Sequence, residues 1–250
     1  MPQVISGINA VKENLKEGKK GIVELLIARG RKSERVREIL SMAREKRIPV
    51  RFKDRLYLDK ISSESSHQGI IAISSNYSYF HLEDLMKIAL DSQKKGLLLV
   101  ADHITDIGNL GSLIRTAEFF GVQGLILPKD RSASVTDTVH KRSAGGSAYL
   151  PISRVVNLAR TLGQLADKKG LWIIGAAGES KTNIYEFDWN RDLVLVLGSE
   201  DKGLSKVIKD QCHHLVSIPR LGHLNSLNVS VAAGIILSEI VRQRGEEGNF

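Results

Sequence analysis

Short apolar runs alternate with amphipathic stretches along most of the chain. The apolar runs are rich in Ile, Leu and Val, which is typical of strands that helices cover on both faces. The stretches between them carry apolar residues at a spacing of three and four, which predicts helices. For the first part of the chain this predicts strands over 22–28, 48–52 and 68–74, taken as parallel, and helices over about 9–16 and 34–47.

A connector with a helical middle and no strand follows, and the alternation then resumes more clearly. Alternating strands and helices predict an open, mostly parallel sheet covered on both faces, so the fold class is α/β. We expect a first domain over 1–75, a linker over 76–95 and a second domain over 96–245. In the second domain the pattern predicts strands over 97–102, 124–128, 171–177, 193–199 and 214–219, and helices near 109–120, 137–143, 157–168, 204 and from 229 onward.

Composition places the chain among ordinary globular proteins, with 42% hydrophobic and 26% charged residues in 250. The single cysteine, Cys212, excludes an internal disulfide and a cysteine-rich zinc site, and it fits a reducing compartment. No apolar run approaches the roughly 20 residues that span a bilayer, and the first residues lack the features of a signal peptide. We therefore expect a cytoplasmic protein.

The net charge of +8 is unevenly distributed along the chain. The segment from Arg29 to Arg55 contains eleven basic and four acidic residues, so it alone carries a net charge of +7. Such a local excess is typical of nucleic-acid binders that contact phosphates. Aromatic residues are only 5%, which disfavours base stacking as the main mode of binding. We expect contacts to the backbone of a structured nucleic acid.

Three loops that follow predicted strands are unusually rich in glycine and polar residues. Any one of them can be explained by turns and helix caps. In open α/β sheets, however, ligands bind outside the carboxyl ends of the strands, so a shared pocket explains all three at once. The loops contain Asp106, Gly108, Asn109 and Gly111; Gly198, Glu200 and Gly203; and Asn225, Ser226, Asn228 and Ser230.

Two predicted helices border these loops. The helix near 109–120 has an inward apolar stripe at Leu110, Ile114, Ala117 and Gly121, and Arg115 lies off that stripe. The last helix begins with more amides and hydroxyls than one cap requires. Its apolar face is formed by Val229, Ala232, Ala233, Ile236, Leu237 and Ile240.

Several common ligands are disfavoured. The fingerprint G-x-G-x-x-G is absent after the first strand of either half, and so are the phosphate loop of nucleotide-binding enzymes and the G-x-S-x-G elbow of hydrolases. No metal is expected, because His213 and His214 are adjacent and would point to opposite faces of a strand. The seven histidines, His103 among them, are interpreted as incidental.

The three loops carry a family resemblance. "NLGSLIRTAEFFG", "LVLGSEDKGLS" and "IPRLGHLNSLNVSVAAGI" resemble, in order and spacing, the three motifs of the SpoU methyltransferases, a branch of the SPOUT superfamily. "SGINAV" and "HQGIIA" resemble the substrate-binding domain of ribosomal RNA guanosine 2′-O-methyltransferases, which is similar to ribosomal protein L30e. The resemblance covers essentially the whole chain. The sequence departs from the motifs at Asp201, where glycine is common, and at Arg220, where methionine is common.

The resemblance implies a small L30e-like α/β domain followed by a SPOUT domain with a parallel sheet and a deep trefoil knot. It implies S-adenosyl-L-methionine as methyl donor, RNA as substrate and a homodimer formed through the knot domain, with neither a metal nor a membrane involved. Residues that would hold the donor are Leu197, Gly198, Ile218, Gly222, Ser226 and Leu227. Residues that would surround the reacting ribose are Asn109, Arg115, Glu200, Ser226 and Asn228. Candidate RNA-binding residues are Arg29, Arg31, Lys32, Arg35, Arg115, Lys141 and Arg142.

Physical chemistry constrains these roles. A 2′-hydroxyl is a weak nucleophile that must lose its proton while oxygen, methyl carbon and sulfur are held in line. The guanidinium of Arg115 is always protonated, so we expect it to stabilise the developing alkoxide and to bind the adjacent phosphate. Glu200 would anchor Asn109 or Arg115, and Ser226 and Asn228 would orient the ribose or the donor.

The sequence therefore predicts 2′-O-methylation of a guanosine in large-subunit ribosomal RNA. A transfer RNA methyltransferase is one alternative, although the N-terminal domain and its basic segment favour ribosomal RNA. The other is a non-catalytic RNA-binding or ribosome-assembly factor, which we would expect to have lost Arg115, Glu200 or Asn228; all three are present.

Overall fold

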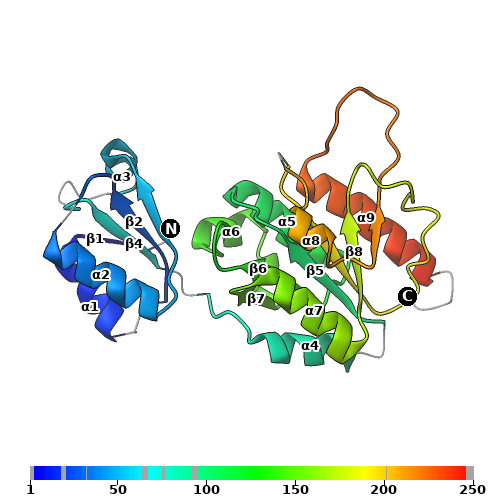
Figure 1. The fold of residues 1–250 in the computed structure, drawn as a ribbon, viewed down its shortest axis with the longest axis horizontal. Coiled ribbons are helices and arrows are strands. Elements are labelled where there is room, and N and C mark those ends of the chain that lie inside the picture. The colour runs from blue at the N-terminus through cyan, green and yellow to red at the C-terminus, as the bar shows by residue number, and fades with distance from the viewer. Residues whose placement is uncertain are drawn as a thin grey trace. The chain divides into compact units, whose positions relative to one another are not determined.

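The computed structural model describes residues 3–17, 21–31, 33–62, 67–74, 77–91, 95–200 and 202–245. They form two compact units, one made of the described residues up to 78 with 134–138, the other of 79–133 with those from 139 on (Figure 1). The predicted boundaries at 75 and 95 stay a prediction. None of the described helices is long and apolar enough to cross a membrane.

The first unit contains a four-stranded mixed sheet with the strand order β1-β4-β2-β3. Only β2 and β3 are parallel, and β4 runs antiparallel to both β1 and β2. The expectation of parallel strands was therefore wrong for β4, because apolar composition reports burial on both faces and not direction. The elements are β1 (Gln3–Ser6), α1 (Ile8–Glu17), β2 (Ile22–Ala28), α2 (Glu34–Glu45), β3 (Val50–Lys53), α3 (Arg55–Ile61) and β4 (Ile70–Ser74).

Helices cover both faces of this first sheet. Leu25 and Ile27 of β2 pack with buried residues of α1 and α2. Leu26 and Ala28, which point the other way, pack with Leu58 of α3. Strand β1 and helix α3 had not been predicted, since each is too short to show a clear period.

The second unit contains a six-stranded, all-parallel sheet with the order β10-β8-β9-β5-β6-β7. This confirms the predicted parallel α/β domain. Strand β7 had not been predicted, because Ser153 and Arg154 interrupt its apolar run. The elements are α4 (Leu82–Leu90), β5 (Leu97–Ala101), α5 (Ile107–Phe119), β6 (Gly124–Pro128), α6 (Asp137–Arg142), η1 (Gly146–Ala148), β7 (Ile152–Val155), α7 (Leu158–Lys169), β8 (Trp172–Ala176), β9 (Leu193–Leu197), α8 (Lys206–Lys209), β10 (His214–Val216) and α9 (Val229–Gly245).

Two groups of helices enclose the second sheet. Buried residues of α4, α7 and α8 pack against alternate side chains of the strands, among them Leu98 and Val100. Helices α5 and α9 pack against each other. The predicted apolar face of α9 is buried apart from Ala232, which is half-buried, and Gly121 lies exposed beyond the end of α5.

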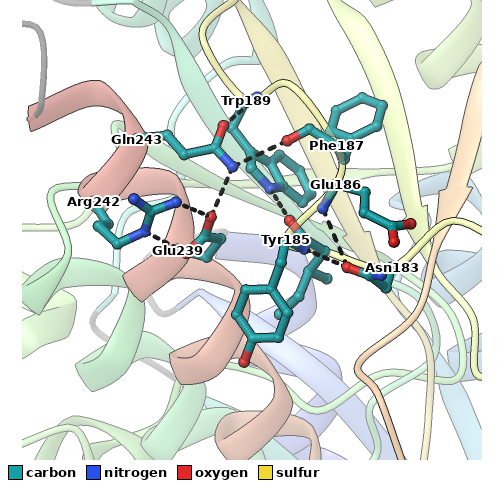
Figure 2. Close-up of polar contacts among 9 residues, drawn as sticks. Asn183, Tyr185, Glu186, Phe187, Trp189, Glu239, Arg242 and Gln243 are labelled. Atoms are coloured by element: carbon teal, nitrogen blue, oxygen red, sulfur yellow. Dashed lines mark hydrogen bonds and ion pairs between the residues drawn. The ribbon is translucent and has the colours of Figure 1, made fainter.

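A polar network ties α9 to the connector between β8 and β9 (Figure 2). Gln243 donates its side-chain amide to the carbonyl of Phe187 (3.1 Å) and to Glu239 (2.7 Å), and it accepts from the backbone N–H of Trp189 (3.1 Å). Glu239 is only 5% exposed, and both its oxygens accept from Arg242, at 2.7 and 2.8 Å. The network fixes α9 and so positions the residues at its start.

The hydrogen bonds from Arg242 hold the pKa of Glu239 below its ordinary value of 4.5, against the opposing effect of burial. A carboxylate with a lowered pKa stabilises the fold above its unfolded pKa, and this contribution is lost as the pH falls through the folded pKa. We expect Glu239→Gln to lower the melting temperature at pH 7, and the difference from the unsubstituted protein to shrink below about pH 4.5. Thermal unfolding across this range measures it. The exposed Glu186→Gln is the control, and a difference independent of pH would contradict the prediction.

Candidate active site

Three loops meet at the carboxyl edge of the second sheet, and a ring of three side chains joins them. Asn109, in the first turn of α5, donates its side-chain amide to Glu200 at 2.8 Å. Asn228, just before α9, donates to the side-chain oxygen of Asn109 at 3.0 Å and to Glu200 at 2.5 Å. The structure thus brings together three of the five residues predicted around the ribose.

The carboxylate of Glu200 accepts three hydrogen bonds. Oε2 accepts from Asn109, while Oε1 accepts from Asn228 and from the backbone N–H of Val229 at 3.2 Å. Val229 is the first residue of α9, and a negative charge at a helix start is favourable. Glu200 therefore joins the loop after β9 to the starts of both α5 and α9.

The polar start of α9, which the sequence left ambiguous, proves to serve two purposes. The side-chain oxygen of Asn228 accepts from the backbone N–H of Ser230 (3.0 Å) and from its hydroxyl (2.6 Å), so Asn228 caps the helix. Both hydrogens of its amide are used within the ring. Asn109 uses only one amide hydrogen there, so it can offer the other to a ligand.

The turn after β9 folds back tightly on itself. The backbone N–H of Gly203 donates to the carbonyl of Ser199 at 2.7 Å, and Gly203 has a φ of +62°. A Cβ on Gly198 would lie 2.1 Å from the carbonyl carbon of Gly203, so this position requires glycine. Leu197 is buried at the end of β9. Asp201 lies outside the described residues.

The segment between β10 and α9 holds the remaining predicted donor-binding residues. Ile218 is half-buried, Leu227 is 47% exposed, and Gly222 and Ser226 are exposed. Within the described part of the chain, Ser226 has no hydrogen bond to the ring. Arg220, one of the two departures from the family motifs, donates to the side-chain oxygen of Asn225 at 2.5 Å.

These surroundings fit an adenosyl group. Ile218 and Leu227 offer apolar surface for an adenine ring. Gly203, in the turn after β9, has open space where a Cβ would stand, so its backbone is not covered by a side chain. Apolar walls with a few polar groups are typical of such pockets.

Helix α6 brings basic residues to the start of α5. A Cβ on Gly111 would lie 2.6 Å from the Cβ of Arg142, and a Cβ on Gly108 would lie 2.9 Å from its Nη1. The two glycines therefore permit Arg142 to lie beside the turn that carries Asn109. Lys141 and Arg115 are exposed, and the guanidinium of Arg115 has no hydrogen bond or ion pair with the described residues.

Asp102 was not predicted from the sequence as a residue near the site. It is only 1% exposed, accepts from the backbone N–H of Ser205 at 3.1 Å and is paired with His103. Burial raises the pKa of the Cys212 thiol to about 11, and the negative charge of Asp102 adds to this shift. An aspartate at the end of a wholly apolar strand is the signal that could have revealed it.

Some basic residues of the first unit lie at the carboxyl ends of β2 and β3. The backbone N–H of Arg29 donates to the carbonyl of Lys53 at 2.9 Å, and the Nζ of Lys53 lies 5.0 Å above the ring of Tyr57. Arg31 is exposed in the same loop as Arg29, and Arg35 is exposed on α2. Lys32 lies outside the described residues.

Residues 96–238 match the model of the SpoU rRNA methylase family, which is more than half of the chain. The chain belongs to the SpoU methyltransferase family. Residues 4–80 match the substrate-binding domain of RNA 2′-O-ribose methyltransferases. Both matches confirm the predicted family and enzyme class, an RNA 2′-O-ribose methyltransferase, and S-adenosylmethionine is the donor of this family.

The relatives of this chain match it over nearly its whole length. The 23S rRNA (guanosine-2′-O-)-methyltransferase RlmB of Pseudomonas aeruginosa is 40% identical over 96% of both chains. YacO of Bacillus subtilis, named only as a TrmH-family tRNA/rRNA methyltransferase, is 35% identical over 98% of this chain and 97% of its own. The SpoU methyltransferase AviRb of Streptomyces viridochromogenes, solved with S-adenosylmethionine, has a TM-score of 0.62 and 25% identity over 97% of this chain and 90% of its own.

Proposed function

We propose that the protein methylates the 2′-hydroxyl of a guanosine in large-subunit ribosomal RNA. The observation that carries the proposal is the ring of Asn109, Glu200 and Asn228, which joins the three motif loops at one edge of the sheet. Full-length similarity to RlmB supports the ribosomal substrate, whereas the name of YacO leaves the RNA open. The intact ring, together with the exposed Arg115, disfavours a non-catalytic factor.

The residues of the ring and the basic residues beside it would have separate roles. S-adenosylmethionine, when bound, supplies an electrophilic methyl group on a sulfonium. Glu200 and Asn228 hold the three loops together through hydrogen bonds, and Asn109 offers its free amide hydrogen to the ribose. Arg115 binds the phosphate beside that ribose and stabilises the negative charge that develops on the 2′-oxygen. Lys141 and Arg142 extend this positive surface toward the RNA backbone.

Residues at the same carboxyl edge of the second sheet would bind S-adenosylmethionine. Leu197 and Gly198 would offer backbone groups at the end of β9, and Ile218 and Leu227 would contribute apolar surface around the adenosine. Gly222 and Ser226, both exposed in the segment before α9, would close over the donor. The donor would then lie beside the ring, as in-line transfer requires.

A cytoplasmic homodimer formed through the second unit, with α9 closing a deep trefoil knot, completes the proposal. Helices α5 and α9 pack together, and both expose apolar side chains: Phe119 on α5 is 77% exposed, and Val231 on α9 is also exposed. Apolar side chains on neighbouring helices are suited to an interface between copies.

Labelled S-adenosylmethionine tests the proposal directly. The protein is incubated with the donor and either 23S ribosomal RNA or total transfer RNA, and the methylated ribose is then mapped. We expect label in one guanosine of 23S RNA. Label confined to transfer RNA would support the rival substrate, and transfer to neither RNA would overturn the proposed function.

Reversing charges in the first unit should weaken RNA binding. We expect the combined change of Arg29, Arg31 and Arg35 to Glu to raise the Kd for 23S RNA fragments by about 10-fold or more at moderate salt. The salt dependence should flatten, with a slope about 0.7 to 0.9 smaller for each phosphate that the protein no longer neutralises. Filter binding across salt concentrations measures this. Calorimetry with S-adenosylmethionine is the control, and a weakened donor affinity would contradict the assigned role.

A further inference from the structure

The turn that leads into β4 holds a glutamine in a costly backbone conformation. The backbone N–H of Ile70 donates to the carbonyl of His67 at 2.9 Å, and the two residues between them, Gln68 and Gly69, have φ of +51° and +77°. The first of two such positions is usually occupied by Gly, Asn or Asp, because the β-carbon of other residues is strained there. Strained residues of this kind occur frequently at functional sites, where the surrounding structure maintains them.

Buried contacts maintain this turn. His67 is only 1% exposed, its Nε2 lies 2.7 Å from Oδ1 of Asp59 on α3, and its Nδ1 accepts from the backbone N–H of Gly69 at 3.0 Å. Since Nδ1 accepts, Nε2 carries the proton and donates to Asp59. In addition, the N–H of Ala28 donates to the carbonyl of Gly69 at 2.9 Å. Both ring nitrogens of His67 are therefore used within the protein, and the polar side chain that the turn offers to solvent is Gln68.

Arg31, in the loop after β2, packs on the same turn. A Cβ on Gly69 would lie 3.6 Å from Cδ and 3.7 Å from Cγ of Arg31, so the apolar stem of the arginine contacts the turn and leaves its guanidinium beyond it. Gln68 and Arg31 are both exposed, and neither side chain has a hydrogen bond or ion pair with the part of the chain that the structure describes. Arg29 lies in the same loop. An unpaired amide is therefore presented beside basic side chains.

An amide recognises a different group from its basic neighbours. A phosphate has only acceptors, which suits the donors of an arginine. A glutamine amide has two donor hydrogens and an accepting oxygen, which match the edge of a nucleobase. In RNA helices side chains cannot read the deep major groove, so sequence is read mainly from unpaired bases in loops and bulges. The pair of side chains is therefore suited to an unpaired base next to a phosphate.

We propose that Gln68 is a specificity-determining residue, whose amide hydrogen-bonds the edge of an unpaired nucleobase of the substrate RNA while Arg31 binds a phosphate beside that nucleotide. The assignment rests on the proposed function, which supplies the RNA. It gives Gln68 a role different from that of the basic residues, because contacts to phosphates carry no sequence information and contacts to base edges do. It also gives a reason for a strained glutamine where glycine would relieve the backbone.

Gln68→Gly separates recognition from folding. Glycine adopts a positive φ without strain, so the melting temperature should not fall and only the amide is lost. We expect the Kd for the 23S fragment that contains the methylated guanosine to rise by about 5-fold or more. The Kd for an unrelated RNA of the same length should stay unchanged, and so should kcat at saturating RNA, since the ring in the second unit is intact. Filter binding with both RNAs and single-turnover transfer measure these effects.

Arg47→Gly is the matched control. Arg47 is exposed in the same unit and has a φ of +53°, so glycine relieves its backbone in the same way. Loss of its charge should change the affinities for both RNAs by the same factor, and the ratio of the two Kd values should stay unchanged.

A double-mutant cycle between protein and RNA identifies the base. Each unpaired position of the 23S fragment is substituted in turn. One substitution should weaken binding by the unsubstituted protein and have little further effect on Gln68→Gly, because the same hydrogen bonds are already lost.

The outcomes are distinct. The same factor of change in both Kd values, no change in either, or additive effects at every substituted position overturns the specificity role and leaves the proposed function intact. Absence of transfer to any RNA by the unsubstituted protein overturns the proposed function and the assignment of Gln68 with it.

Discussion

Replacing Arg115 with alanine should lower kcat for RNA methylation by about 10² to 10³-fold, the usual effect of removing one donor that stabilises a developing negative charge. Arg115 is exposed and makes no hydrogen bond or ion pair with the described residues, so its loss should leave the fold and the melting temperature unchanged. Single-turnover transfer of labelled methyl groups at saturating RNA measures the effect.

The lysine substitution refines this expectation. A lysine at this position would keep the charge but lose the planar fork of donors that, in the proposed role, binds a phosphate oxygen and the 2′-oxygen together, so Arg115→Lys should recover only part of the rate. Ser112→Ala, on an exposed part of the same helix, is the control. Near-normal turnover by Arg115→Ala with unchanged RNA affinity would refute the assigned role.

Replacing Glu200 with glutamine should be almost as damaging, although the two side chains have the same shape. Both oxygens of Glu200 accept hydrogen bonds, Oε2 from Asn109 and Oε1 from Asn228 and Val229. A glutamine amide has one accepting and one donating end, so either orientation points N–H toward N–H. A flipped Asn109 does not resolve this conflict, because its oxygen already accepts from Asn228.

One unsatisfied partner of this kind costs about 1 to 3 kcal/mol, which corresponds to a roughly 5 to 160-fold loss. We expect Glu200→Gln to lower both kcat and the melting temperature, since the ring joins two helix starts. The exposed Glu186→Gln is the control. In an Asn109→Ala background the same change should have a smaller effect, because one donor is already gone. Additive effects would mean that the two residues are not coupled.

Much of the architecture could be predicted from the sequence because buried apolar residues recur with the period of a helix or form short runs in strands. Strands β2 and β6 were predicted at their observed bounds, and α9 was predicted from its apolar spacing. The direction of β4 was not predicted, since strands covered on both faces have similar compositions whether parallel or antiparallel. Strand β7 was missed because polar residues at a sheet edge break the apolar run.

The sequence by itself determined the family, because three of its loops resemble the SpoU motifs, and this resemblance supplied the candidate residues Asn109, Arg115, Glu200 and Asn228. Only the tertiary structure decided how these side chains are paired. Hydrogen bonds between positions 91 and 119 residues apart assign Glu200 and Asn228 to holding the loops together and leave Asn109 and Arg115 open to a ligand. Such pairings depend on distance and direction in space, which local sequence patterns do not record.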